Sequence, residues 1–310
     1  MYLRKGTLVS EIQPDYKQTF HHDFTMNISR DVILKMKHED KLTDRDLKVA
    51  ELIYRFHFAT AEQVTEYLND PDYTVGAIQA RLDKLVHHRV LNKFLLSKTK
   101  EDRVYQDAMI IYCLDLGGKY LLSSFSSHDT SDWFSSNNFR ISELIAKDLM
   151  TLDFYLKLYR HTEGKIEYFE SSSLFQAGGS NIYPSFHFAI KVDGVRRYYI
   201  GEVVQEDDLP LLFRKKAEKL SQLLGTQAWK KYFFDIDEYP TLLLVAPNDL
   251  CAVEVAKGMK EVAGLDRYRI TTPERYNQPL HEAGAFLRFL PEHGMLQPVR
   301  FTAFDPAKLG

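Results

Sequence analysis

The stretch QARLDKLVHHRVLNKF, residues 79–94, changes its pattern of apolar residues partway along. Leu82, Leu85 and Val86 recur at helical spacing, whereas residues 90–96 form a short apolar run typical of a β-strand. The stretch therefore predicts a helix that packs through one face and leads directly into a strand. The opposite face of this helix is predicted to point outward and carries polar groups that can bind a ligand: Gln79, Arg81, Lys84 and His88.

Two shorter helices are predicted before this stretch. Thr43 precedes an acidic first turn and can cap a helix, and Thr60 is followed three residues later by Gln63, a capping-box pattern. After the third helix, two β-like runs at 90–96 and 104–114 flank a charged segment. Three short helices followed by a two-stranded hairpin predict a winged helix-turn-helix domain over residues 41–122.

The charge around the third helix indicates a possible partner. Residues 81–103 contain seven Lys or Arg and three Asp or Glu, although the whole chain of 310 residues has a net charge of −3. A cationic outer face can enter the major groove of duplex DNA, while a basic wing follows the phosphates. The predicted wing contacts are Lys98, Lys100 and Arg103. Two alternatives remain open: solvated charges on an ordinary amphipathic helix, or a winged helix that docks another protein.

The rest of the chain predicts an N-terminal arm, a linker and a second domain. Residues 1–40 show no clear periodicity and are interpreted as an arm, and residues 123–139 are rich in Ser, Asp and Asn, which is typical of a linker. In residues 140–310, strands alternate with helices, which predicts an α/β sheet domain. Its expected elements are helices at 142–161, 210–224 and 249–263, strands at 165–169, 185–192, 196–204, 241–245, 268–272 and 285–290, and a turn at Asp193-Gly194.

Three segments of the chain resemble the replication-relaxation family of plasmids and other mobile elements. They are KLTDRDLKVAELIYRFHFATAEQVTEYL (41–68), QARLDKLVHHRVLNKF (79–94) and IIYCLDLGGKYLL (110–122). The resemblance extends in element order over about 40–245. It implies a DNA-binding winged helix, followed by a domain similar to the PD-(D/E)xK core of restriction endonucleases.

A nuclease core of this type needs two acidic residues on adjacent strands to hold Mg²⁺ and a lysine to position water. By resemblance, the first acid falls on Ser185, and the family's Glu-x-Asp falls on Glu202-Val203-Val204. Only Glu202 keeps a carboxylate, so a catalytically inactive domain without a bound metal or other cofactor is predicted. The alternative is a Mg²⁺-dependent nuclease that uses Glu202 with Glu206 or Asp207 and Lys215.

The remaining features suggest a cytoplasmic chain. Cys113 and Cys251 both lie in apolar runs, which fits a reducing compartment. No run approaches the roughly 18 apolar residues of a membrane span. The aromatic residues at 198–199 and 229–234 are interpreted as core. The expected partners are double-stranded DNA, a second copy of the chain, and a relaxase or replication protein.

Overall fold

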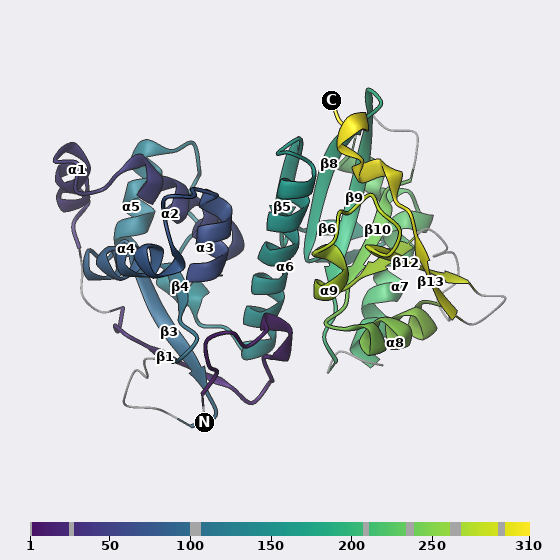
Figure 1. The fold of residues 1–310 in the computed structure, drawn as a ribbon, viewed down its shortest axis with the longest axis horizontal. Helices are drawn as coiled ribbons and strands as arrows, with labels where there is room; N and C mark the ends of the chain where they lie inside the picture. The colour runs from purple at the N-terminus through teal and green to yellow at the C-terminus, as the bar shows by residue number, and fades with distance from the viewer. Residues whose placement is uncertain are drawn as a thin grey trace. The chain divides into compact units, whose positions relative to one another are not determined.

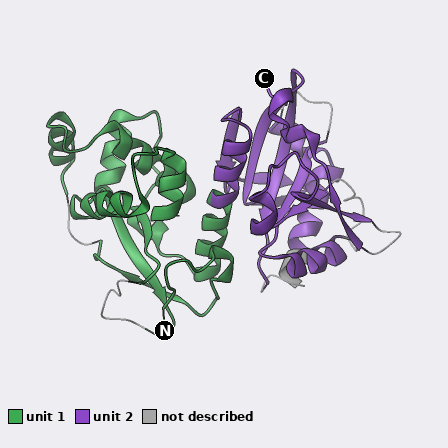
Figure 2. Cartoon of the chain, viewed as in Figure 1, with its two compact units in different colours: residues 1–152 green, residues 153–310 purple. Residues whose placement is uncertain are grey.

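The computed structural model describes residues 2–24, 28–99, 107–206, 211–233, 239–260, 268–290 and 295–310. The chain divides into two compact units, Met1–Leu152 and Asp153–Gly310 (Figure 2). Both units combine helices with β-sheet, so the protein is of mixed α and β class.

Unit 1 contains short helices and a four-stranded sheet (Figure 1). Its elements in chain order are η1 (Val9–Glu11), β1 (Lys17–Phe20), α1 (Arg30–His38), α2 (Asp44–Phe56), β2 (Phe58–Thr60), α3 (Ala61–Leu68), α4 (Val75–His87), β3 (Leu91–Ser97), β4 (Ile111–Leu114), α5 (Leu116–Phe125), η2 (Ser135–Asn138) and the first half of α6 (Ser142–His161).

Threonine caps start three of these helices. The side chain of Thr43 accepts a hydrogen bond from the backbone of Asp46, and Thr60 and Gln63 form the reciprocal capping box that the sequence predicts. Thr74 caps α4 in the same way through the backbone of Ala77. Each cap satisfies a backbone N–H that the first helical turn leaves without a partner. The predicted starts of α2, α3 and α4 are confirmed.

The sheet of unit 1 has the order β1-β3-β4-β2, with all pairs antiparallel. Strand β1 pairs with β3 along its whole length, from Lys17 opposite Ser97 to Phe20 opposite Phe94. The prediction of an arm over residues 1–40 is therefore incomplete, because this segment adds an edge strand and the helix α1. Ile33 of α1 is fully buried, which fixes that helix to the rest of the unit.

Residues 123–139 do not form an exposed linker. Trp133 and Asn138 are both buried, and the side chain of Asn138 donates a hydrogen bond to the carbonyl of Leu114 over 2.8 Å. The division between the units instead falls within α6, after Leu152. The serine-rich composition correctly indicated a segment with little regular structure. Trp133 and Asn138 within this segment nevertheless pack against unit 1.

Unit 2 is built around a seven-stranded sheet. Its elements are the second half of α6, then β5 (Tyr168–Ser171), β6 (Phe175–Ala177), β7 (Ser180–Ile182), β8 (Phe186–Val192), β9 (Val195–Val203), α7 (Leu211–Gly225), η4 (Ala228–Lys231), β10 (Thr241–Val245), α8 (Asp249–Lys260), β11 (Tyr268–Thr271), α9 (Pro273–Tyr276), β12 (Phe286–Leu290), β13 (Met295–Val299), η5 (Thr302–Phe304) and η6 (Pro306–Lys308).

The strand order in this sheet is β13-β12-β11-β10-β9-β8-β5. Strands β9, β10 and β11 are parallel to one another, whereas β8 is antiparallel to both β5 and β9. The turn between β8 and β9 has positive φ at both Asp193 and Gly194, as a tight hairpin of this kind requires. The predicted hairpin turn is confirmed, and so are the bounds predicted for α6 and β10.

Helices cover both faces of the unit 2 sheet (Figure 1). On one face, α7 and α8 contribute to a hydrophobic cluster with strands β8 to β12. On the other face, Phe154 of α6 stacks on Phe186 of β8 with ring centroids 5.1 Å apart. Burial on both faces explains why β10 reads as a continuous apolar run in the sequence.

Candidate functional site

Helix α4 exposes only part of the surface that the sequence predicts for nucleic-acid binding: Lys84 is exposed, whereas Gln79, Arg81 and His88 are half-buried. Its buried residues are Ile78, Leu82, Leu85 and Val86, which pack inward as expected. The exposed side of the helix changes in character along its length. Near its start it carries small or apolar residues, and near its end it carries Lys84 and His87.

The sequence predicts that Arg81 points outward, but in the structure its side chain is held by contacts within unit 1. Its Nε donates to Asp46 Oδ1 over 2.8 Å, its second nitrogen pairs with the same carboxylate, and it also donates to the carbonyl of Lys41. Asp46 is only 1% exposed. Burial alone would raise the pKa of Asp46, but hydrogen bonds from Arg81 and Thr43 outweigh burial and hold that pKa below its ordinary value. Arg81 therefore neutralises a buried charge within unit 1.

His88, at the end of α4, lies near several positively charged side chains. The pKa of His88 is lowered first by burial and then by the positive charges of His87, Lys84, Arg81 and Lys41. Of these side chains, Lys41, Lys84 and His87 are exposed. We call Lys41, Lys84, His87 and His88 the α4 cationic group, although the lowered pKa of His88 favours its neutral form. Lys41 is also ion-paired with Glu39, with 2.7 Å between the charged atoms, so Lys84 carries most of the unbalanced positive charge in this group.

The other predicted contacts lie in varied surroundings. Gln79 is half-buried and accepts a hydrogen bond from Lys5 over 3.4 Å. Lys98 is exposed and pairs with Asp15, with 2.7 Å between the charged atoms. Lys100 and Arg103 lie outside the described residues.

The second candidate site is the end of strand β9, where Glu202 is only 1% exposed. Its carboxylate accepts a hydrogen bond from Lys216 Nζ of α7 over 2.5 Å and another from the backbone of Ser185 over 3.2 Å. The hydroxyl of Ser185 in turn accepts from the backbone of Val203 over 3.0 Å. The structure therefore brings Ser185, Glu202 and Lys216 together.

Among the described residues, these surroundings do not fit a metal site. A divalent cation needs several oxygen ligands, and here Lys216 already pairs with the buried carboxylate of Glu202, while the neighbouring Ser185 carries no carboxylate. Glu206, predicted as a further ligand, accepts a hydrogen bond from Asn248 over 3.3 Å. The cation beside Glu202 is Lys216 and not the predicted Lys215, whose side chain is exposed. Within the described ranges, no group of three His, Cys, Asp or Glu residues is placed to hold a metal ion.

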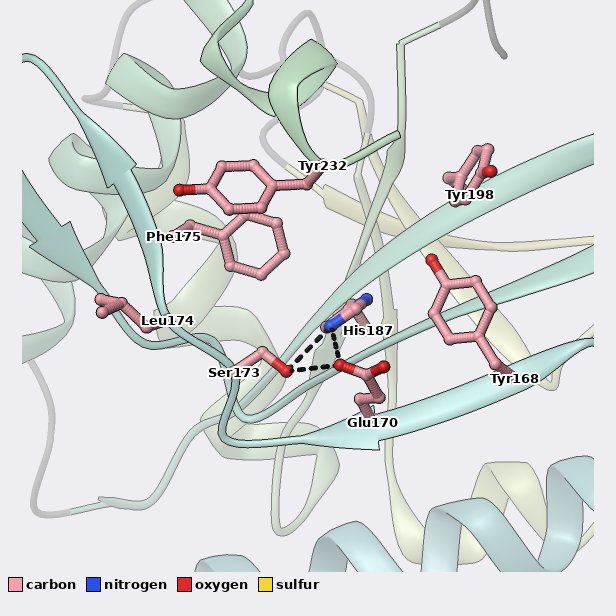
Figure 3. Close-up of a pocket in the computed structure, with 8 residues that line it drawn as sticks. All are labelled: Tyr168, Glu170, Ser173, Leu174, Phe175, His187, Tyr198 and Tyr232. Atoms are coloured by element: carbon pink, nitrogen blue, oxygen red, sulfur yellow. Dashed lines mark hydrogen bonds and ion pairs between the residues drawn. The ribbon is translucent and has the colours of Figure 1, made fainter. Parts of the chain in front are cut away.

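A cavity in unit 2 brings together residues that the sequence did not suggest as a site. It has a volume of about 360 Å³. Its walls are mostly aromatic or polar and consist of Tyr168, Glu170, Ser173, Leu174, Phe175, His187, Tyr198 and Tyr232 (Figure 3). Tyr198 belongs to the buried core, as interpreted, and Tyr232 packs against that core; both also line this cavity. Glu170 and His187 are far apart in sequence and become neighbours only because β5 pairs with β8.

Comparisons with known proteins give little similarity. No family model matches the chain, and no solved structure gives a significant match. The chain is similar to translation initiation factor 5A of Methanococcus vannielii, with 29% identity over 77 residues. This match covers 25% of the chain and spans about half the length of that relative, 56%. Within the described helices, none is both long enough and apolar enough to cross a membrane.

Proposed function

We propose that this chain binds duplex DNA through α4 and the α4 cationic group. The observation that carries the proposal is the clustering of Lys41, Lys84, His87 and His88 at one end of an exposed helix. Phosphate neutralisation by such groups supplies most of the affinity of non-specific DNA binding. The small residues Gly76, Ala77 and Ala80 on the exposed side of α4 would allow its backbone to approach a groove closely.

The order of elements in unit 1 supports a winged helix. Helix α2, strand β2, helices α3 and α4 and strands β3 and β4 follow one another as they do in that fold, with β4 paired to both β2 and β3. In winged-helix proteins the helix that corresponds to α4 enters the major groove. Arg81 is left out of the proposed contact surface because it serves Asp46.

For unit 2 we infer an inactive domain of the restriction-endonuclease type. The succession β5, β8, β9, α7, β10 and the position of Glu202 at the end of β9 support this assignment. Ser185 and the Glu202–Lys216 ion pair support the loss of metal chemistry. The family that the sequence resembles would make this a cytoplasmic accessory protein in replication, DNA processing or transcriptional control of a mobile element. A second copy of the chain, or a relaxase or replication protein, would then be the partner of unit 2.

A direct test is the binding of a random pool of DNA duplexes, measured by fluorescence anisotropy at several salt concentrations. Wild-type affinity should fall steeply with salt. The variant Lys41→Ala/Lys84→Ala should bind more weakly and lose about two units of the salt slope, because each phosphate contact accounts for about one. Lys191→Ala/Lys257→Ala is the matched control, since it removes two exposed lysines from unit 2. Equal weakening in the control would contradict the proposed interface.

A second candidate, a protein-docking helix, is favoured by one observation. Val75 at the start of α4 and Tyr73 just before it are 37% and 39% exposed, and the guanidinium of Arg45 lies over the Tyr73 ring, 4.0 Å from its centroid. A docking helix predicts no salt-dependent duplex binding by the wild-type chain. It also predicts that Tyr73→Ala/Val75→Ala reduces the capture of a partner protein. The DNA-binding proposal predicts instead that substitutions in the α4 cationic group reduce duplex affinity more than Tyr73→Ala/Val75→Ala does.

A further inference from the structure

The cavity in unit 2 has a size and a composition suited to a small ligand. Its volume of about 360 Å³ lies in the lower part of the range of ligand pockets, and such pockets combine apolar walls with a few convergent polar groups. The cavity is formed by residues of β5, β8 and β9, by the segment that leads into β6, and by Tyr232 after η4.

One polar cluster lies at the wall of this cavity. The hydroxyl of Ser173 donates to Glu170 Oε2 over 3.0 Å, and His187 Nε2 lies 3.1 Å from the same oxygen and 2.9 Å from Ser173 Oγ (Figure 3). An ionised carboxylate only accepts hydrogen bonds, so His187 must carry its proton on Nε2. His187 is only 7% exposed and held by strand β8, so the cluster fixes the position of the Glu170 carboxylate.

The arrangement of these three groups is unsuited to nucleophilic catalysis. A serine–histidine–acid triad uses one ring nitrogen for the serine and the other for the acid. Here both Ser173 and Glu170 contact the same nitrogen of His187. The Glu170 carboxylate is therefore not placed as the orienting member of a triad; it lines the cavity while contacting Ser173 and His187.

The aromatic side chains that line the cavity form two packed pairs rather than a flat slot. Phe175 and Tyr232 have ring centroids 4.5 Å apart and are tilted by 54°, and Tyr168 and Tyr198 are 6.3 Å apart and tilted by 50°. In Figure 3 the first pair lies on one side of His187 and the second pair on the other. Ala189 separates the two tyrosines across the strand ladder, and its small side chain leaves room between them. Rings tilted in this way do not sandwich a planar base.

We propose that this cavity binds a small organic ammonium cation, such as a methylated ammonium group, between its aromatic rings and the Glu170 carboxylate. The faces of aromatic rings attract cations, and methyl groups on nitrogen suit an apolar wall. Glu170 supplies the negative charge, and none of the described lining residues is a lysine or arginine. Arg196, on the same strand as Tyr198, is ion-paired with Glu167 and also hydrogen-bonds the side chain of Tyr198, so its charge is shared between these two partners.

Calorimetric titration with choline tests the proposal, with the neutral analogue in which a tert-butyl group replaces the trimethylammonium group as the ligand control. Choline should bind saturably, and the neutral analogue should bind at least about tenfold more weakly because it lacks the charge. Equal binding of the two ligands, or no saturable binding of choline, would overturn the proposal. A peptide carrying trimethyllysine, titrated in the same way, distinguishes a free ammonium compound from a modified protein tail as the source of the cation.

Three variants assign the binding to this cavity. Glu170→Gln keeps the shape of the side chain and should weaken choline binding by roughly fivefold. Tyr168→Leu should also weaken it, whereas Tyr168→Phe keeps the ring and should bind like the wild type. Glu170 has a side chain that is 61% exposed, so its substitution should leave the fold intact, which circular dichroism would verify. Unchanged affinity in both Glu170→Gln and Tyr168→Leu would show that the cation binds elsewhere and would refute the site.

Discussion

Each unit of this protein contains a carboxylate that is only 1% exposed and is paired with a cation, but the two pairs are supported differently. Asp46 accepts hydrogen bonds from Arg81 and also from the backbone and hydroxyl of Thr43. Glu202 accepts from Lys216 and, more weakly, from the backbone of Ser185. A buried charge is tolerated only when its hydrogen-bonding capacity is satisfied. Asp46 is thus part of the start of α2, whereas Glu202 depends largely on one lysine.

The two cations of α4 differ in the same way: Arg81 is held by a buried partner, whereas Lys84 is exposed. Arg81 and Lys84 are three residues apart in sequence and both are predicted to contact DNA, yet Arg81 pairs with Asp46 and Lys84 is exposed. Substitution of Arg81 would therefore disturb folding as well as any contact with DNA. Lys84 is the cleaner probe of the proposed interface.

The largest effect is expected from Arg81→Ala. Removal of the guanidinium leaves Asp46 buried without its cation and should lower the free energy of unfolding by roughly 3 kcal/mol. Urea denaturation followed by circular dichroism measures the change. Lys84→Ala, which removes an exposed charge from the same helix, should stay within about 0.5 kcal/mol of the wild type. Similar losses in the two variants would mean that the Asp46–Arg81 pair has no special structural role.

The same pair gives a dependence on pH. The pKa of Asp46 in the folded chain lies below its ordinary value of 3.8, so the pair stabilises the fold fully above that value. The stabilisation is lost as the pH falls through the lower, folded pKa. The difference between the wild type and Arg81→Ala should accordingly shrink in acid, while the effect of Lys84→Ala should not follow this pattern.

A smaller loss, about 2 kcal/mol, is expected from Lys216→Ala, because Lys216 is partly exposed and water can reach its end of the pair. Lys215→Ala is the matched control, since it removes the neighbouring exposed lysine from the same helix. The double variant Glu202→Gln/Lys216→Ala should recover part of the stability, because a buried amide costs less than an unpaired buried charge. Thermal unfolding at neutral pH measures all three. If the double variant is less stable than Lys216→Ala, the carboxylate contributes through contacts other than the ion pair.

The features predicted most accurately from the sequence are those that depend on neighbouring residues. The capping threonines Thr43 and Thr60 and the turn at Asp193-Gly194 depend on side chains within a few residues, and the structure confirms them. The edge strand β1 was not predicted. Its partner β3 lies far along the sequence, at a distance of about half of unit 1. The four residues of β1 also show no strong alternation of apolar and polar residues, so the local sequence gives little indication of a strand.

The partners of the candidate site residues were missed for the same reason. Asp46 lies 35 residues from Arg81, and Glu170 lies 17 residues from His187, so only the packing of the chain joins them. Lys215 was the predicted lysine, but the phase of α7 directs the adjacent Lys216 toward Glu202. Residue types at the end of β9 could not indicate which lysine pairs with Glu202.

The smallest change in stability is expected from substitution of Ser185. Its dependence on Mg²⁺ distinguishes an inactive domain from a working metal site. Ser185→Asp places a second carboxylate beside Glu202 and removes the hydroxyl that accepts from Val203, so the fold should lose roughly 1 kcal/mol in the absence of metal. Excess Mg²⁺ should restore stability to this variant, because two neighbouring carboxylates can share the ion and ligand binding stabilises the folded state. Thermal unfolding with and without Mg²⁺ measures the effect.

Two controls test whether the effect of Mg²⁺ on Ser185→Asp comes from the added carboxylate. Ser185→Asn has nearly the same shape as Ser185→Asp but no charge, so it should gain nothing from Mg²⁺. The wild type should also be unaffected, because Lys216 already neutralises Glu202. Should Mg²⁺ stabilise the wild type as much as the aspartate variant, and should the wild type cleave DNA in a manner abolished by Glu202→Ala, unit 2 would be an active nuclease. Lys216 would then serve as its lysine in place of the predicted Lys215.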